Sequence, residues 1–105
     1  MTARERLPNR HAGTTLAYEC VGLHYVCTYS RYADRRIGEL FISNHKSNSA
    51  ADTNARDPAI AFSFAVQNGA DPEAIRLALC RGSRGRANGP LGQALDLLTE
   101  WERGP

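Results

Sequence analysis

The sequence predicts an α+β fold, a two-layer sandwich in which a three-stranded antiparallel sheet is followed by three helices packed on one face (β-β-β-α-α-α). Residues 14–42 hold three stretches in which polar and apolar side chains alternate, the period of a half-buried strand. Residues 57–103 instead hold three apolar stretches, each preceded by Asp or Asn and by a proline suited to a first helical turn. A run of strands followed by a run of helices is typical of the α+β class.

The strands are expected at residues 14–20, 23–30 and 37–42. Val21-Gly22 is suited to a tight turn between the first two, and the polar residues 32–36 have the length of a second hairpin loop. Residues 1–13 show no periodicity and are expected to form an N-terminal arm. With 105 residues, the chain has room for one core, so residues 14–105 are expected to form a single domain.

Residues 43–56 are rich in Ser, Asn, Ala and Asp, and we expect a mobile or functional loop there. The first helix is expected to begin at Asp57-Pro58 and to end at Asn68-Gly69; a start near Asp52, with Pro58 in the first turn, is the alternative. A shorter helix follows Asp71-Pro72. The last helix follows Asn88-Gly89-Pro90, and five of its side chains share one face: Leu91, Ala94, Leu95, Leu98 and Trp101.

Composition excludes some classes of function. The net charge of +2 is too small for nucleic acid binding through the overall field alone. The sequence has no apolar run of membrane-spanning length and no apolar segment behind its polar first residues. Cys20, Cys27 and Cys80 form neither an even set nor a closely spaced pair. We therefore expect a cytoplasmic protein with free thiols and no membrane contact.

A basic, glycine-rich loop before the last helix is the strongest local candidate for a binding site. Guanidinium groups and the backbone amides of the helix start could together hold a phosphate. The predicted ligand-binding or anion-binding residues are Arg81, Arg84, Arg86, Asn88 and Gly89. The loop lacks the Lys-Ser/Thr ending of a P-loop. A solvated connection whose glycines make turns is the alternative.

A second candidate is the polar loop after the third strand, with Asn44, His45, Lys46 and Ser47 as contact residues. It has no spaced carboxylate partner or nucleophile pattern, which favours binding over catalysis. Tyrosines and arginines on the sheet suit single-stranded nucleic acid, but core packing explains the tyrosines as well.

A zinc site is the third candidate. Cys20, His24 and Cys27 have suitable donor atoms, and Cys80 or His45 could complete the set. On a regular strand, however, His24 and Cys27 face opposite sides. We therefore expect no metal site, no cofactor and no catalytic residue.

Four short motifs carry a resemblance to a known family: Gly38-Glu39-Leu40-Phe41-Ile42, Ala55-Arg56-Asp57, Ala65-Val66-Gln67-Asn68-Gly69 and Asp71-Pro72-Glu73-Ala74-Ile75. Across about residues 14–98 the chain resembles the TSCPD domain, which is the carboxy-terminal region of adenosylcobalamin-dependent ribonucleotide reductases and also a short stand-alone protein. The chain has no Thr-Ser-Cys-Pro-Asp motif, no paired zinc-type cysteines and no room for the reductase barrel. The resemblance implies a small fold that works beside a nucleotide enzyme or alone, without reductase activity.

These observations favour a non-enzymatic binding or accessory protein. We expect it to act through protein contacts or by recognising the phosphate of a nucleotide or nucleic acid, and an inhibitor encoded by a mobile element against a host complex is one version. The small net charge favours a protein partner. A homodimer is compatible with the fold, because a three-stranded sheet leaves open edges. The alternative is a trans-acting domain or subunit of a ribonucleotide reductase-type enzyme.

Overall fold

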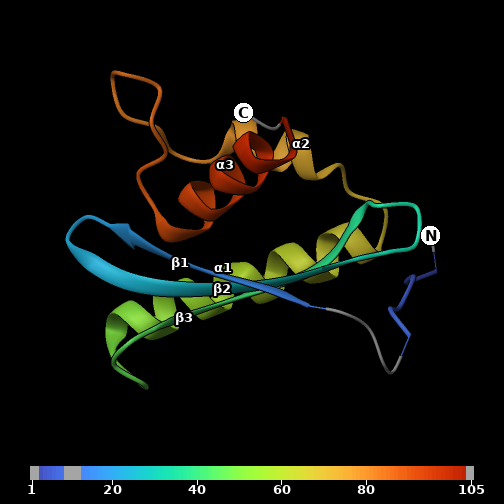
Figure 1. The fold of residues 1–105 in the computed structure, drawn as a ribbon, viewed down its shortest axis with the longest axis horizontal. Coiled ribbons are helices and arrows are strands. Elements are labelled where there is room, and N and C mark those ends of the chain that lie inside the picture. Colours follow the sequence, from blue (N-terminus) through green and yellow to red (C-terminus); the bar gives the residue numbers. More distant parts are fainter. Residues whose placement is uncertain (1–2, 9–12, 104–105) are drawn as a thin grey trace.

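The computed structural model describes residues 3–8 and 13–103, and the side chains of these residues up to position 100. The predicted arm, residues 1–13, therefore lies partly outside the described residues, as does the side chain of Trp101. The elements follow one another in the predicted order: β1 (Thr14–Cys20), β2 (Leu23–Arg31), β3 (Ile37–Asn44), α1 (Ala50–Gln67), α2 (Pro72–Ala78) and α3 (Pro90–Arg103) (Figure 1). The α+β fold class is confirmed.

The sheet is an antiparallel meander with strand order β1-β2-β3. Val21 and Gly22 both have positive φ, at 50° and 76°. Two consecutive left-handed residues make the tight turn whose twist matches that of the strands. The turn leaves Cys20 directly opposite Leu23, so the predicted first hairpin is confirmed.

The core lies between the sheet and the helices. On the sheet, Tyr25, Cys27, Leu40 and Ile42 are buried, and the ring of Tyr25 stacks on that of Tyr18 with centroids 5.8 Å apart. The helices contribute eight further buried apolar side chains: Ala55, Ala59, Phe62, Val66, Leu91, Ala94, Leu95 and Leu98. The predicted packing face of the last helix is thus confirmed for its described side chains.

The favoured start of the first helix, at Asp57-Pro58, was wrong, and the alternative start near Asp52 is closer to the structure. Helix α1 begins at Ala50, where the Ser49 hydroxyl caps it by accepting a hydrogen bond from the backbone N–H of Asp52. Pro58 therefore lies inside the helix, past its first turn, and is exposed. Residues 50–56 are helical and do not continue the loop, because Ser49 and Asp52 start the helix before the proline is reached.

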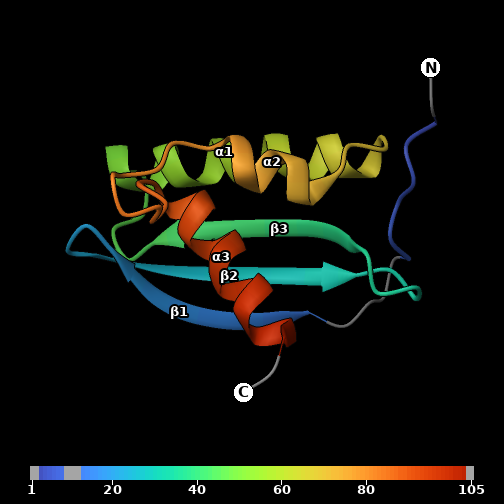
Figure 2. The same cartoon turned by 90° about the horizontal axis from the view of Figure 1, so that it is seen from above.

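Helix α1 runs alongside β3 (Figure 2). Three of its side chains bind backbone groups of β3 that do not face β2. The Ser63 hydroxyl contacts both the N–H and the C=O of Leu40. Gln67 donates to the C=O of Gly38, and Asp52 accepts from the N–H of Asn44. The helix therefore covers one edge of the sheet with matched donors and acceptors.

The segment 3–8 lies against the carboxyl end of α1. The N–H of Glu5 donates to the C=O of Gln67 over 2.7 Å, and the guanidinium of Arg4 stacks over the ring of Phe64 at 4.2 Å.

None of the helices in the described part of the chain combines the length and the apolar character needed to cross a membrane.

Candidate anion-binding site

Residues 81–87 form a short hairpin between α2 and α3, which we call the arginine lobe (Figure 1). Arg81 and Ala87 pair across its base, and the N–H of Gly82 donates to the C=O of Arg86 over 2.9 Å. The turn is closed by a bond from the N–H of Gly85 to the C=O of Gly82, and Gly85 has φ +80°, a conformation that glycine adopts without strain. Ser83 and Arg84 are exposed at the tip.

Arg81, predicted to bind an anion, is already paired within the protein. Its Nη2 donates to Oδ1 of Asp96 over 2.8 Å and its Nη1 to Oδ2 over 2.9 Å. The same two nitrogens also donate to the carbonyls of Gly85 and Arg76. Its Nε is buried and has no hydrogen-bond partner. It is the only such atom among the buried side-chain nitrogens and oxygens of the described residues. Arg81 therefore joins the lobe to both neighbouring helices.

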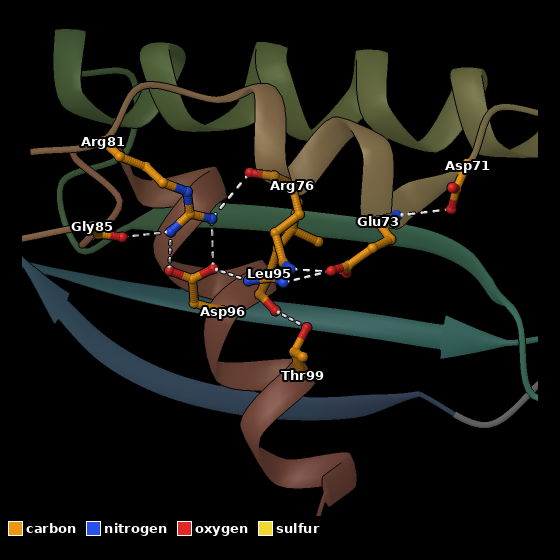
Figure 3. Close-up of polar contacts among 8 residues, drawn as sticks. All are labelled: Asp71, Glu73, Arg76, Arg81, Gly85, Leu95, Asp96 and Thr99. Carbon is orange, nitrogen blue, oxygen red and sulfur yellow. Dashed lines mark hydrogen bonds and ion pairs between the residues drawn. The ribbon is translucent and has the colours of Figure 1, made fainter.

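Asp96 is the centre of an ion-pair network that lies under the lobe (Figure 3). Arg76 donates to Oδ1 of Asp96 over 2.9 Å and, through Nε, to Glu73 over 2.9 Å. Hydrogen bonds from Arg81 and then Arg76 hold the pKa of the Asp96 carboxyl below its usual range, although desolvation opposes them. The network fixes α2, α3 and the lobe relative to one another.

Arg84 and Arg86 are exposed, and their guanidinium groups have no partner among the described residues. They line an open hollow of about 620 Å³ between the lobe, the first hairpin turn and the start of α3. The other lining residues are Glu19, Cys20, Val21, Gly82, Ser83, Ala87, Asn88 and Gln93. Two arginines thus line this hollow, while the side chain of Glu19, by the alternation of β1, points to the side of the sheet away from the helices.

The start of α3 packs directly under the lobe. Gln93 donates from Nε2 to the C=O of Ala87 over 2.8 Å, and Gly92 is so close that an added Cβ would lie 2.7 Å from the Cβ of Ala87. Gly92 is buried, whereas Asn88 is exposed and Gly89 is half-buried. Of the two predicted residues at the helix start, Asn88 is therefore the more accessible.

The polar loop after β3 is held by its own contacts. Asn44 is buried, and its side chain donates to the C=O of His24 and accepts from the N–H of Lys46. The buried carboxylate of Asp52 accepts from the N–H groups of Asn44 and Asn48, and the bond from Asn44 contributes most to holding its pKa below the usual range. Asn44 thus fixes the loop, while His45, Lys46 and Ser47 remain exposed contact candidates.

Sequence reasoning missed the part that Asp52 plays, because it considered this residue only as part of a loop or, in the alternative, as a position near the helix start. The spacing of Ser49 and Asp52 is that of a helix cap and a residue of the first turn, and this local signal could have identified the helix start. No local signal could have shown that the Asp52 carboxylate binds the backbone at the end of β3.

The thiols lie apart from the histidines. Cys20 and Cys27 are buried on the side of the sheet that faces the helices, whereas His24 is on the opposite side and Cys80 is exposed. Burial raises the pKa of Cys27 to about 12, so its thiol is protonated at neutral pH. Within residues 3–8 and 13–103 no group of three His, Cys, Asp or Glu side chains is placed to hold a metal ion.

A second hollow, of about 500 Å³, lies between the β2–β3 loop and helices α2 and α3. Sequence reasoning did not identify it, because its lining residues are far apart in the chain. Its charged groups are largely paired with one another: Arg36 with Asp34, and Arg76 with Glu73. The hollow beside the arginine lobe is therefore the better candidate for an anionic ligand.

Comparison with known proteins gives a partial match. No family model matches the chain, and no solved structure matches it. The chain is 38% identical over 66 residues, 63% of its length, to a vitamin B12-dependent ribonucleotide reductase of Agrobacterium fabrum. It is 35% identical over 69 residues, 66% of its length, to the reductase of the same name from Bradyrhizobium diazoefficiens.

The chain spans only 5% and 6% of the length of these two relatives. The similarity concerns a small segment of each reductase, and it agrees with the resemblance to a TSCPD domain seen in the sequence. The predicted relationship is confirmed at this level: about two thirds of the chain is similar to a short segment of vitamin B12-dependent ribonucleotide reductases.

Proposed function

We propose that the protein is a non-catalytic binding module that recognises a phosphate-bearing ligand through the arginine lobe. The observation that carries the proposal is the difference between its arginines: Arg81 is fully engaged with Asp96, whereas Arg84 and Arg86 are exposed and have no partner in the described part of the chain. A guanidinium group offers a fork of N–H donors that matches the oxygens of a phosphate.

The lobe is suited to binding because its position is already fixed. The ion pairs of Asp96 with Arg81 and Arg76 hold the base of the lobe against α2 and α3. A ligand that binds Arg84 and Arg86 would therefore order two side chains and would not have to order the whole loop. Such preorganisation reduces the entropic cost of binding.

The ligand class that we favour is a nucleotide. The relatives are named as ribonucleotide reductases, and a phosphate is the feature that all nucleotides share. The hollow of about 620 Å³ lies within the usual size range of small-molecule sites. Its rim adds the exposed side chain of Asn88, whose amide group suits the polar edges of a base or sugar. The proposal implies a cytoplasmic protein.

The test compares the Arg84→Glu, Arg86→Glu double variant with wild type. Titration calorimetry with a nucleoside triphosphate, the matching nucleoside and pyrophosphate should show binding of the two phosphate compounds only. The double variant should lose affinity by about tenfold or more. Arg35→Glu is the matched control, because Arg35 is also an exposed arginine but lies at the other hollow. Equal binding by all three proteins, or no binding by wild type, would contradict the proposal.

The sequence similarity favours a second candidate, a domain or subunit that acts in trans on a ribonucleotide reductase. We base it on the match of about two thirds of this chain to the two reductases. The test is sedimentation of the chain together with a vitamin B12-dependent reductase from the same source organism. A complex that survives the Arg84→Glu, Arg86→Glu double variant would support this function through a different surface from the lobe.

A further inference from the structure

We propose that two copies of this chain associate through their β1 strands to form one continuous antiparallel sheet. The inference does not depend on the proposed function. It begins with a difference between the two edges of the sheet. The backbone of β3 is capped by Asp52, Ser63 and Gln67 of α1. In the described part of the chain, β1 pairs with β2 alone.

The backbone groups that face outward from β1 follow from the pairing of the strands. Leu40 directs its N–H and C=O to Ser63, so its neighbour Phe41 is the residue that bonds to Thr28 of β2. Thr28 then has no backbone bonds left for Thr15, its partner on β1. Because this alternation continues along a strand, the N–H and C=O groups of Thr15, Ala17 and Glu19 face outward.

The residues of β1 carry few of the features by which natural proteins block an open edge. Its seven residues pair with β2 without a bulge from Thr14 opposite Tyr29 to Cys20 opposite Leu23. It contains no proline and no lysine, and Glu19 is its one charged residue. An edge strand of this length that is free of bulges and nearly uncharged is a template for another strand.

The sequence of β1 is complementary to itself. A two-fold axis at Ala17 pairs all seven residues of the strand with those of a second copy. Leu16 then lies opposite Tyr18 of the second copy, twice, on the side of the sheet that faces the helices. Both side chains are only half-buried in the single chain, and an aliphatic side chain opposite an aromatic one is a favourable pair.

The other side of the strand is also compatible with this register. Thr15 lies opposite Glu19 of the second copy, so no like charges meet, and Ala17 lies opposite its own copy. Shifting the register by two residues keeps the same backbone groups paired but leaves two residues of each strand without partners. The Ala17 register therefore makes the most backbone bonds.

Helix α3 adds cover for the second strand. Figure 2 shows that α3 crosses the sheet and that its carboxyl end extends past β1. A strand added beside β1 would therefore lie partly beneath this end, and its apolar side chains would be shielded on the helix-facing side. The second copy supplies its own α3 in the same way, by symmetry.

The first measurement is the mass of the wild-type protein by light scattering during gel filtration, which should give twice the mass of one chain. The second uses charges at the proposed axis. Ala17→Lys and Ala17→Glu each place like charges opposite one another, and both should be monomers with unchanged circular dichroism. Mixing the two variants should restore a dimer, because residue 17 then meets the opposite charge.

Phe41→Lys is the control, because Phe41 is exposed on the uncovered face of the sheet and away from β1. This variant should remain a dimer. A wild-type protein that is monomeric across the micromolar range would overturn the proposal, as would a dimer that Phe41→Lys dissociates and Ala17→Lys does not. Failure of the mixed variants to pair would rule out the Ala17 register.

Discussion

Arg81 and Asp96 form a two-point ion pair, with N to O distances of 2.8 and 2.9 Å, which joins the base of the arginine lobe to the middle of α3. Asp96 is also bound by Arg76 of α2. One half-buried carboxylate therefore lies between two guanidinium groups and reduces their mutual repulsion. Its removal should affect stability and, through the position of the lobe, ligand binding.

We expect Asp96→Asn to lower the free energy of unfolding by about 1–3 kcal/mol, because Arg81 loses its carboxylate partner and Arg76 is left with Glu73. Glu100→Gln is the matched control: it also removes a carboxylate from α3, but Glu100 is exposed and has no partner among the described residues. Urea unfolding followed by circular dichroism measures both. Equal stabilities of the two variants would show that the network contributes little.

The pH dependence of stability follows from the same carboxylate. The pKa of Asp96 in the folded protein lies below its ordinary value of 3.8, chiefly because of hydrogen bonds from Arg81. A group whose pKa is lowered by folding stabilises the protein above its unfolded pKa, and this contribution is lost as the pH falls through the folded pKa. Wild type should therefore lose more stability than Asp96→Asn between pH 5 and pH 2, a range set by that ordinary value.

Thermal unfolding at a series of pH values provides the measurement. The difference in stability between wild type and Asp96→Asn should be constant near neutral pH and should shrink in acid. Asp52 also has a lowered pKa, so wild type and variant will both weaken in acid. A difference that does not change with pH would mean that the charge of Asp96 is not the source of its effect.

Gly92 is predicted to be essential for the packing of the lobe against α3. An added Cβ would lie 2.7 Å from the Cβ of Ala87, a distance that side chains do not adopt without movement of the backbone. Gly92→Ala should therefore lower the free energy of unfolding by about 1–3 kcal/mol, even though alanine is the better helix former. Calorimetric unfolding would measure this loss.

Gly89→Ala is the control for Gly92→Ala, because an added Cβ at Gly89 meets no atom within 4 Å. Because Gly89 is at the N-cap of α3, where glycine is preferred to alanine, this variant should cost at most about 1 kcal/mol and less than Gly92→Ala. Adding Ala87→Gly to Gly92→Ala should recover part of the loss, since it removes the methyl group that causes the clash. If the double variant is no more stable than Gly92→Ala, the clash is not the cause.

The strands were predictable because the alternation of side chains has a direct physical cause. Tyr25 and Cys27 are buried, whereas Val26 between them is exposed, as the period of a strand requires. The start of α1 was not predictable from the apolar pattern. Residues 50–56 have no apolar side chain larger than that of alanine, and their helix is stabilised by bonds of Asp52 to the backbone of Asn44, at the end of β3, and of Asn48.

The candidate site shows the same limit. The composition of the loop indicated a basic surface, but nothing local distinguished Arg81 from Arg84 and Arg86. The distinction depends on Asp96, which lies 15 residues beyond Arg81 in the chain. A sequence pattern can therefore locate a group of arginines, while the fold decides which of them remain free for a ligand.

The closed edge of the sheet gives the last prediction. The Ser63 hydroxyl contacts both the N–H and the C=O of Leu40, at 2.8 and 2.9 Å, and both residues are buried. Ser63→Ala would leave the N–H of Leu40 without an acceptor and out of reach of water. The expected loss is about 1–3 kcal/mol of unfolding free energy, measured in urea.

Hydrogen exchange at the Leu40 amide distinguishes a local effect from a global one. In Ser63→Ala this amide should exchange faster than in wild type, relative to the amides of the central strand β2, because α1 no longer holds the backbone of β3 at this point. Ser47→Ala, which removes an exposed hydroxyl from the loop after β3, is the control and should change neither quantity. If Leu40 keeps its wild-type protection relative to β2, the hydroxyl of Ser63 does not close this edge, and the contrast with β1 on which the proposed dimer rests would be weakened.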